Sequence, residues 1–259
     1  MKQTLKIIKI GGNVMNSKEA LMGFLADFSK IKTPKILVHG GGKKATEISE
    51  KLGLQSKMIG GRRITNQAEL EVVTMVYAGL LNKNITAQLQ QNNCNAIGLS
   101  GADANIITAH KRIVKNIDYG FAGDVDAVNN KIVKVFLDNK LTPVFCAITH
   151  NKKGQLLNTN ADTIANELAK SLSADYRVEL IYCFEKKGVL LNVQEEDSVI
   201  EKIDVDLYEN LQQKNIIADG MLPKLNNCFD ALKNGVEKVI IGLPEVILNN
   251  NIKHTTLVL

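Results

Sequence analysis

The hydrophobic pattern is sharpest near the start of the chain, where apolar residues alternate with lysines over Leu5–Ile10 and the pair Gly11–Gly12 follows. A period of two is typical of a β-strand, and paired glycines indicate a tight turn. A second apolar run, Lys35–His39, is too short for a surface helix and leads into Gly40–Gly42. Residues 17–29 between them favour a helix that opens with a capping serine. Strand, helix and strand with glycines at the strand ends predict a parallel sheet, whose ligands gather at the carboxyl ends of its strands.

The rest of the chain continues to alternate helices and strands. We expect further helices at residues 43–52, 66–91, 132–137 and 205–213, after Asn158–Asp162, and from Leu222 onward. We expect further strands at residues 96–99, 141–148, 179–184, up to Leu191, and at 238–242, with short strands and turns over 106–128. No linker of low complexity and no repeat interrupts this order. A soft division falls near Ala174 and separates residues 1–174 from 175–259.

Composition fits one large α/β domain or two small ones. Among 259 residues, 45% are hydrophobic and 23% charged, so a core can form without metals or disulfides. Aromatic residues make up only 5% and Trp is absent, which argues against a surface that stacks nucleic acid bases. The net charge of +5 comes from scattered lysines, and solubility accounts for it better than a polyanionic partner. We therefore expect no nucleic acid partner.

The cysteines and the N-terminal residues bear on location. Cys94, Cys146, Cys183 and Cys228 are far apart and lack zinc-site spacing, as expected of free thiols in a reducing cytosol. The first residues contain no long apolar stretch, and no run approaches the ~20 residues of a membrane span. We expect a soluble cytoplasmic protein with no membrane partner.

Lys9 and the two glycines that follow it are the first candidates for chemistry. Glycine lets backbone N–H groups approach a bulky anion, and the lysine adds a positive charge, so this stretch predicts an anion-binding turn. The chain contains no G-x-x-x-x-G-K-[ST], and Gly40–Gly42 with its two lysines does not satisfy G-x-G-x-x-G. The glycine triplet alone could equally be a plain tight turn. His39, which precedes it, is interpreted as a structural residue.

A set of motifs in order along nearly the whole chain resembles the acetylglutamate kinase family, which has the amino acid kinase fold. The motifs are Lys9–Gly12, Val38–Gly42, Gly61–Thr65, Asn158–Asp162 and Asp219–Lys224. The resemblance implies a three-layer αβα sandwich around a largely parallel open sheet. It also implies transfer of the γ-phosphoryl group of ATP to the side-chain carboxylate of N-acetyl-L-glutamate, the second step of arginine biosynthesis.

The same resemblance assigns roles to residues. Lys9 and Lys224 match the two catalytic lysines that contact the transferring phosphoryl group, and Asp162 matches the carboxylate that orients both. Residues assigned to the acceptor are Gly41, Gly42, Arg63 and Asn158. Residues assigned to phosphate and nucleotide are Gly11, Gly12, Glu185, Gly188 and Gly220. The lobe 1–174 would then bind acyl-glutamate and dimerise, and 175–259 would bind nucleotide. Magnesium would arrive with ATP, since no dense carboxylate cluster offers a cage.

The roles make chemical sense, because a γ-carboxylate with a reference pKa near ~4.3 is already an anionic nucleophile at pH 7. The reaction needs positioning and positive charge rather than a general base. Arg63 would bind the α-carboxylate of the acceptor, because a forked donor suits a carboxylate. Its neighbour Arg62 is expected to be a surface charge.

Some features depart from the family pattern or leave alternatives open. Glu185–Val189 stands where many members have Asp-Val-x-Gly-Val. Arginine-inhibited members carry an extra N-terminal helix before the first strand, so we expect a homodimer insensitive to arginine. The apolar stripe of the helix at 66–91 fits either the family's dimer interface or the monomer core. An N-succinyl-L-glutamate acceptor, another acceptor used by this fold and a non-catalytic ligand-binding member are the competing hypotheses. Binding of a nitrogen-signalling protein is left undecided.

Overall fold

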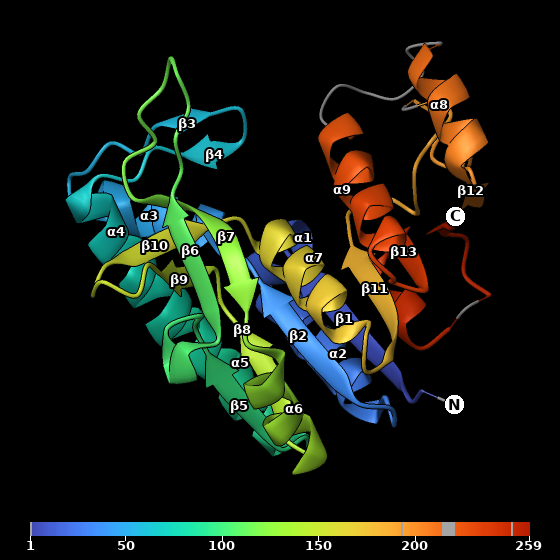
Figure 1. Cartoon of the computed structure of the whole chain (residues 1–259), viewed down its shortest axis with the longest axis horizontal. Helices are drawn as coiled ribbons and strands as arrows, with labels where there is room; N and C mark the ends of the chain where they lie inside the picture. The colour runs from blue at the N-terminus through green and yellow to red at the C-terminus, as the bar shows by residue number, and fades with distance from the viewer. Residues whose placement is uncertain (1, 193, 214–220, 250) are drawn as a thin grey trace. The chain divides into compact units, whose positions relative to one another are not determined.

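The computed structural model describes residues 2–192, 194–213, 221–249 and 251–259. The chain forms two compact units (Figure 1). Unit 1 combines residues 1–35 with 165–259, and unit 2 consists of residues 36–164. The first strand and first long helix thus belong to the same unit as the C-terminal part of the chain. The predicted separation of functions between 1–174 and 175–259 stays a prediction.

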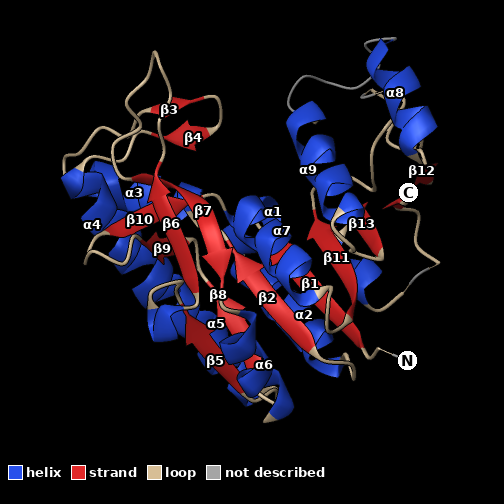
Figure 2. Ribbon diagram, viewed as in Figure 1, coloured by secondary structure: helices blue, strands red, loops and turns tan. Residues whose placement is uncertain are grey.

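The sheet strands of unit 1 are mostly parallel, as the strand–helix–strand pattern predicts (Figure 2). They follow the order β12 (Lys202–Ile203), β14 (Thr255–Leu257), β13 (Lys238–Gly242), β11 (Arg177–Cys183) and β1 (Thr4–Ile10). β1 pairs in parallel with β11, with Leu5 opposite Val178, and β11 pairs in parallel with β13. Among the described strands of unit 1, the antiparallel pair is β13 with β14. The carboxyl ends of β1 and β11 therefore meet at one edge, where the residues after each strand can form a site.

Helices cover this part of the sheet and supply much of its core. They are α1 (Gly12–Asn16), α2 (Lys18–Lys30), α7 (Ala161–Leu172), α8 (Val205–Gln213), α9 (Leu222–Lys233) and the 3-10 helix η3 (Pro244–Ile247). The Ser17 hydroxyl accepts a hydrogen bond from the backbone N–H of Ala20, so the predicted cap of α2 is confirmed. Phe24, Leu25 and Phe28 form its buried face. α9 contacts β13, and α2 contacts η3.

Unit 2 holds the parallel strands β2 (Lys35–His39), β8 (Thr142–Phe145) and β5 (Ala96–Leu99). A closed barrel adjoins them, in the order β10 (Leu156–Thr159), β7 (Ala122–Val128), β6 (Ile107–Lys111) and β9 (Ile148–His150). A hairpin consists of β3 (Met58–Ile59) and β4 (Arg62–Arg63). The helices are α3 (Gly42–Lys51), α4 (Gln67–Thr74), the π-helix η1 (Met75–Leu81), α5 (Asn82–Gln91), the 3-10 helix η2 (Asp103–Asn105) and α6 (Asn130–Asp138).

The predicted α/β class with a largely parallel central sheet is confirmed. Some elements differ from expectation. The strand expected up to Leu191 is only a bridge between Leu190 and Val199, and the strand expected at 141–148 is divided between β8 and β9. β10 and β14 were missed, because three or four residues are too few to establish a period.

The helix expected at residues 66–91 is one continuous helical segment with a π-helical centre, η1. Its apolar stripe is mainly core: Leu70, Val73, Val76 and Tyr77 are each at most 5% exposed. Leu80 is 44% exposed and Met75 is 57% exposed. The stripe consists of Leu70, Val73, Val76, Tyr77 and Leu80, and burial within unit 2 therefore explains the first four. Within the part of the chain that the structure describes, no helix has the length and apolar character needed to cross a membrane.

Candidate functional site

The first glycine turn, Gly11–Gly12, links β1 to the short helix α1. A Cβ added to Gly11 would lie 2.9 Å from Lys9 Nζ, so the ammonium group lies against the turn. Gly12 has φ of +49°, and a Cβ there would lie 2.7 Å from Glu185 Oε1. The positive φ favours glycine at Gly12, whereas the groups that approach both glycines are the mobile ends of the Lys9 and Glu185 side chains. The Lys9 ammonium group therefore lies beside Gly11, and the Glu185 carboxylate lies beside Gly12.

The two predicted catalytic lysines both lie near the end of β11. Lys9 acts electrostatically on Cys183, the last residue of β11, whose thiol pKa is raised to about 12 by burial. Lys224, in the first turn of α9, places Nζ 4.3 Å from the centre of the Phe184 ring. A cation over an aromatic face is held in position while its charge stays available to an anion. Lys9 and Glu185 therefore lie at the first glycine turn, whereas Lys224 lies over Phe184, the residue before Glu185.

Two predicted nucleotide-binding residues remain, Gly188 and Gly220. Gly188 is packed tightly: a Cβ there would lie 2.5 Å from Thr255 Oγ1 and 2.9 Å from Val199 Cγ1. Thr255 Oγ1 also accepts a hydrogen bond from the Val189 N–H at 2.8 Å. Gly188 thus has a packing reason to be glycine, and its contact with nucleotide stays a prediction. Gly220, with Asp219 of the same motif, lies outside the described residues.

The second glycine turn, Gly40–Gly42, links β2 to α3, with Gly41 at the N-cap position. A Cβ on Gly41 would collide with Leu81 Cδ1 and lie 2.9 Å from Tyr77 Cδ1. Both side chains come from the π-helix η1. The turn is therefore packed directly against a buried helix, and only glycine fits at its centre.

Arg63 is buried beside this second turn and 5% exposed. Its NH2 group donates to the Gly42 carbonyl oxygen at 2.9 Å and to Thr46 Oγ1 at 2.6 Å. Its NH1 group donates to Glu69 Oε2 at 2.8 Å and to Ser56 Oγ. All four acceptors belong to the protein. The sequence predicts that Arg63 binds the acceptor substrate. The structure shows in addition that Arg63 forms a buried ion pair with Glu69 and a direct hydrogen bond to the glycine turn.

Arg62 differs from the expected surface charge, because it is half-buried. Burial lowers the pKa of its guanidinium, and Arg112 lowers it further, while Asp124, Tyr119 and Asp162 act in the opposite direction. Arg112 itself is held by Asp124 through two hydrogen bonds of 2.7 and 3.0 Å. Arg62 and Arg112 therefore lie within electrostatic range of one another. Their proximity could not be predicted from the sequence, because they are fifty residues apart.

Asn158 and Asp162 lie on either side of the start of α7. Asn158, in β10, donates from Nδ2 to Thr65 Oγ1 at 3.0 Å, which fixes its amide next to the segment that carries Arg63. Asn160 caps α7 by accepting from the backbone N–H groups of Asp162 and Thr163. Asp162 occupies the first helical turn, as expected. That Asp162 orients Lys9 and Lys224 stays a prediction.

His39 ends β2 immediately before the second glycine turn and is completely buried. Its Nδ1–H donates to the Gly40 carbonyl oxygen at 2.8 Å, so Nε2 accepts from Asn82 Nδ2 at 3.1 Å. Burial lowers its pKa to about 4, which keeps the imidazole neutral at pH 7. The structural interpretation of His39 agrees with these contacts.

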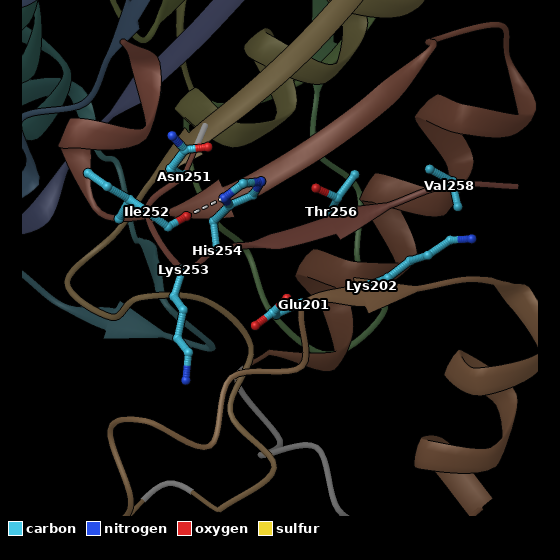
Figure 3. Close-up of a pocket in the computed structure, with 8 residues that line it drawn as sticks. All are labelled: Glu201, Lys202, Asn251, Ile252, Lys253, His254, Thr256 and Val258. Atoms are coloured by element: carbon cyan, nitrogen blue, oxygen red, sulfur yellow. Dashed lines mark hydrogen bonds between the residues drawn. The ribbon is translucent and has the colours of Figure 1, made fainter. Parts of the chain in front are cut away.

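A cavity of about 440 Å³ in unit 1 was not expected from the sequence (Figure 3). Its lining includes Glu201, Lys202, Lys253 and His254, whose Nδ1–H donates to the Ile252 carbonyl oxygen at 2.6 Å. The lining comes from two segments fifty residues apart, so only their pairing as β12 and β14 brings them together. Within the described ranges, no group of three or more His, Cys, Asp or Glu side chains could hold a metal ion.

Comparison with known proteins gives consistent matches over the full length of the chain. The model of the amino acid kinase family matches residues 4–242. A protein of Cytophaga hutchinsonii named acetylglutamate kinase is 53% identical, with 99% of each chain covered. A protein of the same name from Phocaeicola vulgatus is 50% identical and covers 95% of this chain and 96% of its own. Carbamate kinase from Giardia lamblia shares the fold, with a TM-score of 0.72, 14% identity and coverage of 99% and 98%.

Proposed function

Because the chain belongs to the amino acid kinase family, we propose that it is a kinase that phosphorylates the side-chain carboxylate of N-acetyl-L-glutamate with ATP. A γ-carboxylate oxygen attacks the γ-phosphorus, the bond from that phosphorus to the ADP oxygen breaks, and N-acetylglutamyl 5-phosphate forms. The observation that carries the proposal is the 53% identity over 99% of the chain with a relative named acetylglutamate kinase. The product is an acyl phosphate, and the reaction is the second step of arginine biosynthesis.

The residues of the first glycine turn suit the phosphate side of this reaction. Gly11 and Gly12 offer backbone N–H groups, and Lys9 and Lys224 offer positive charge to the oxygens of the transferring group. The proposal assigns Asp162 the orientation of these lysines. It assigns nucleotide contacts to Glu185, Gly188 and Gly220.

The residues around the second glycine turn suit the acceptor. Gly41 and Gly42 stand at the start of α3, where N–H groups favour a carboxylate. Arg63 supplies a buried positive charge whose NH1 and NH2 groups already bind Glu69 and the Gly42 carbonyl, and Asn158 supplies an amide fixed by Thr65. No general base is required, because the acceptor carboxylate is ionised at pH 7.

Magnesium enters this proposal with ATP rather than through a protein cage. The described residues hold no cluster of three or more metal-binding side chains, and Glu185 is the carboxylate next to the first glycine turn. A Mg²⁺ ion bound to the phosphates would neutralise their charge. Glu185 and backbone groups of the turn are the residues that would meet the complex.

The same reaction on N-succinyl-L-glutamate is the second candidate, and Arg62 is the observation that favours it. A succinyl group ends in a carboxylate, which needs a cation or several donors. Arg62 and Arg112 supply positive charge close to the segment 63–65 that contacts Asn158. An acetyl group makes no use of that charge. Arg62→Ala should therefore raise KM for the succinyl substrate about tenfold and leave KM for the acetyl substrate within about threefold.

We also propose a homodimer in the cytoplasm. The exposed apolar side chains Met75 and Leu80 on η1 support association of two copies through this helix, because exposed apolar groups favour an interface. The four cysteines, all within the described residues, form no disulfide bond, in keeping with a reducing compartment.

The test is an acyl phosphate assay. The protein is incubated with Mg-ATP and one acid at a time, and acyl phosphate is trapped with hydroxylamine as the hydroxamate. N-acetyl-L-glutamate, N-succinyl-L-glutamate, L-glutamate and carbamate are compared. Product from an N-acylated glutamate alone would support the proposal and would identify the acyl group. No hydroxamate from either acylated glutamate would overturn it.

A further inference from the structure

Glu69 is a buried carboxylate to which neither the sequence motifs nor the proposed reaction assigns a role. It is 3% exposed and lies at the third position of α4, after the cap Asn66. The Asn66 side chain accepts from the Glu69 N–H at 2.9 Å, as a capping box predicts. In a capping box the glutamate side chain reaches back to the N-cap N–H. Here Oε1 instead accepts from Ser56 Oγ at 2.8 Å, and Oε2 accepts from Arg63 NH1 at 2.8 Å.

Glu69, Ser56 and Arg63 close a small ring of hydrogen bonds. Ser56 Oγ donates to Glu69 and accepts from Arg63 NH1, so each member holds the other two. This ring fixes one edge of the guanidinium group. A guanidinium is planar, so fixing NH1 also fixes the direction of NH2.

The NH2 edge of Arg63 acts on the second glycine turn. It donates to the Gly42 carbonyl oxygen and to Thr46 Oγ1, and Thr46 Oγ1 donates to the same carbonyl at 3.0 Å. Tyr77 and Leu81 from η1 also pack against the turn and leave no room for a Cβ on Gly41, and Tyr77 itself interacts with Arg63. The turn is therefore held both by side chains of η1 and by the Arg63 guanidinium.

A buried ion pair is an expensive way to gain stability, because desolvation of both charges offsets most of their attraction. Stability of α4 alone therefore gives little reason for a charged pair at this place. Orientation does give a reason, since the pair connects the start of α4 to the start of α3 through one rigid group.

We propose that Glu69 is a positioning residue of the acceptor site: through Arg63 it holds the Gly41–Gly42 turn in the geometry that receives the substrate carboxylate. The inference rests on the proposed kinase function and names the group that orients its acceptor side. Glu69 does not touch the substrate. Its effect reaches the substrate through Arg63 and the backbone N–H groups of the turn.

The experiment compares Glu69→Gln with Glu71→Gln in the full-length protein. Glutamine keeps the size and one acceptor of the side chain but removes the charge that fixes Arg63. Glu71 lies two residues further along α4, is exposed, and accepts from Gln67. Steady-state hydroxamate assays give KM for the acylated glutamate, KM for Mg-ATP and kcat, and thermal unfolding reports the fold.

We expect Glu69→Gln to raise KM for the acid about tenfold, with KM for Mg-ATP within about twofold of wild type. Glu71→Gln should match wild type in all three constants. A merely structural Glu69 would lower the unfolding midpoint and the yield of active protein and leave KM for the acid unchanged. That result would overturn the inference.

A double-mutant cycle with Arg63→Ala gives the second readout. If Glu69 acts through Arg63, adding Glu69→Gln to Arg63→Ala should change KM for the acid by less than about twofold, while additive effects would contradict the inference. If Glu69→Gln does not fold, Ser56→Ala replaces it. This variant keeps both charges and opens the ring, and it should raise KM for the acid by about threefold. An unchanged KM would then overturn the inference.

The outcome also separates this inference from the proposed function. If the wild-type protein forms no acyl phosphate from either acylated glutamate, the proposed function fails. If the wild type is active and Glu69→Gln retains the wild-type KM for the acid, only the positioning role fails.

Discussion

The two glycine turns have similar sequences and different surroundings. Both follow a parallel strand and both precede a helix, α1 in unit 1 and α3 in unit 2. The first turn is flanked by Lys9 Nζ on Gly11 and Glu185 Oε1 on Gly12. The second is contacted by Tyr77 and Leu81 of η1 and by Arg63, which donates to the Gly42 carbonyl oxygen. The first turn is therefore lined by charge, whereas the second is held by packing and a buried network.

This difference fits the two jobs that phosphoryl transfer requires. Charge that meets the transferring group must already stand where negative charge develops, and lysine ammonium groups supply such charge. An acceptor carboxylate must be held at a fixed distance and angle, and a rigid turn supplies that. Under the proposed function, the same glycine-rich pattern serves both purposes, and the neighbours decide which.

Removal of either lysine tests the first glycine turn, and we expect it to have the largest effect on kcat. Lys9→Ala and Lys224→Ala should each lower kcat about 10²–10³-fold, because each removes a cation that faces the transferring phosphoryl group. The measurement is steady-state hydroxamate formation at saturating substrates. Lys233→Ala, in the last turn of α9, is the matched control and should behave as wild type. A wild-type kcat in Lys9→Ala would remove the first turn from the reaction.

Removal of Arg63 tests the second glycine turn. Arg63→Ala should raise KM for the acylated glutamate about 10–100-fold, because the forked donor and the hold on the Gly42 carbonyl are both lost. KM for Mg-ATP should change little. Arg177→Ala, an exposed arginine of β11, serves as the control. Equal changes in both KM values would show that the second turn is not specific to the acceptor.

Alanine at each turn separates packing from charge. Gly41→Ala should lower the free energy of unfolding by about 1–3 kcal/mol, because its Cβ meets buried Tyr77 and half-buried Leu81. Gly12→Ala should cost about 1–2 kcal/mol through its positive φ, since the Glu185 carboxylate can move aside. Gly23→Ala, in α2 with open space around it, should gain about 0.5–1 kcal/mol. Denaturant unfolding measures all three, and a larger loss in Gly12→Ala than in Gly41→Ala would reverse the comparison.

His39, which precedes the second glycine turn, makes the stability of the protein depend on pH. Its pKa falls from 6.5 to about 4 on burial, so between these values the unfolded chain binds more protons than the folded one. Stability from this group is complete above pH 6.5 and falls by up to about 1.4 kcal/mol for each pH unit between 6.5 and 4. Unfolding midpoints from pH 7 to 4.5 measure it. In His39→Asn the slope should be smaller, and an equal slope would contradict the assignment.

Local sequence predicted the elements with clear periods or caps. The ends of β2, β5, β13 and α8 agree with the expected strands and helix, and Ser17 and Asn66 cap their helices. The motifs also predict Lys9 and Lys224 as partners; the structure places Lys9 at the first glycine turn and Lys224 over Phe184, and their joint role stays a prediction. Short elements such as β12 and β14 were not predicted, because two or three residues carry no measurable pattern.

The sequence by itself determined the α/β class, the glycine turns and the residue types that phosphoryl transfer needs. Only the tertiary structure decided what surrounds each turn. Glu69 shows why: its position in the sequence predicts a helix cap, and its contacts with Ser56 and Arg63 make it part of a buried network. Arg62 and Arg112 likewise interact electrostatically only because folding brings together residues that are fifty positions apart in the chain. Periodicity and capping depend on neighbours along the chain, whereas burial and charge pairing depend on residues that folding brings together.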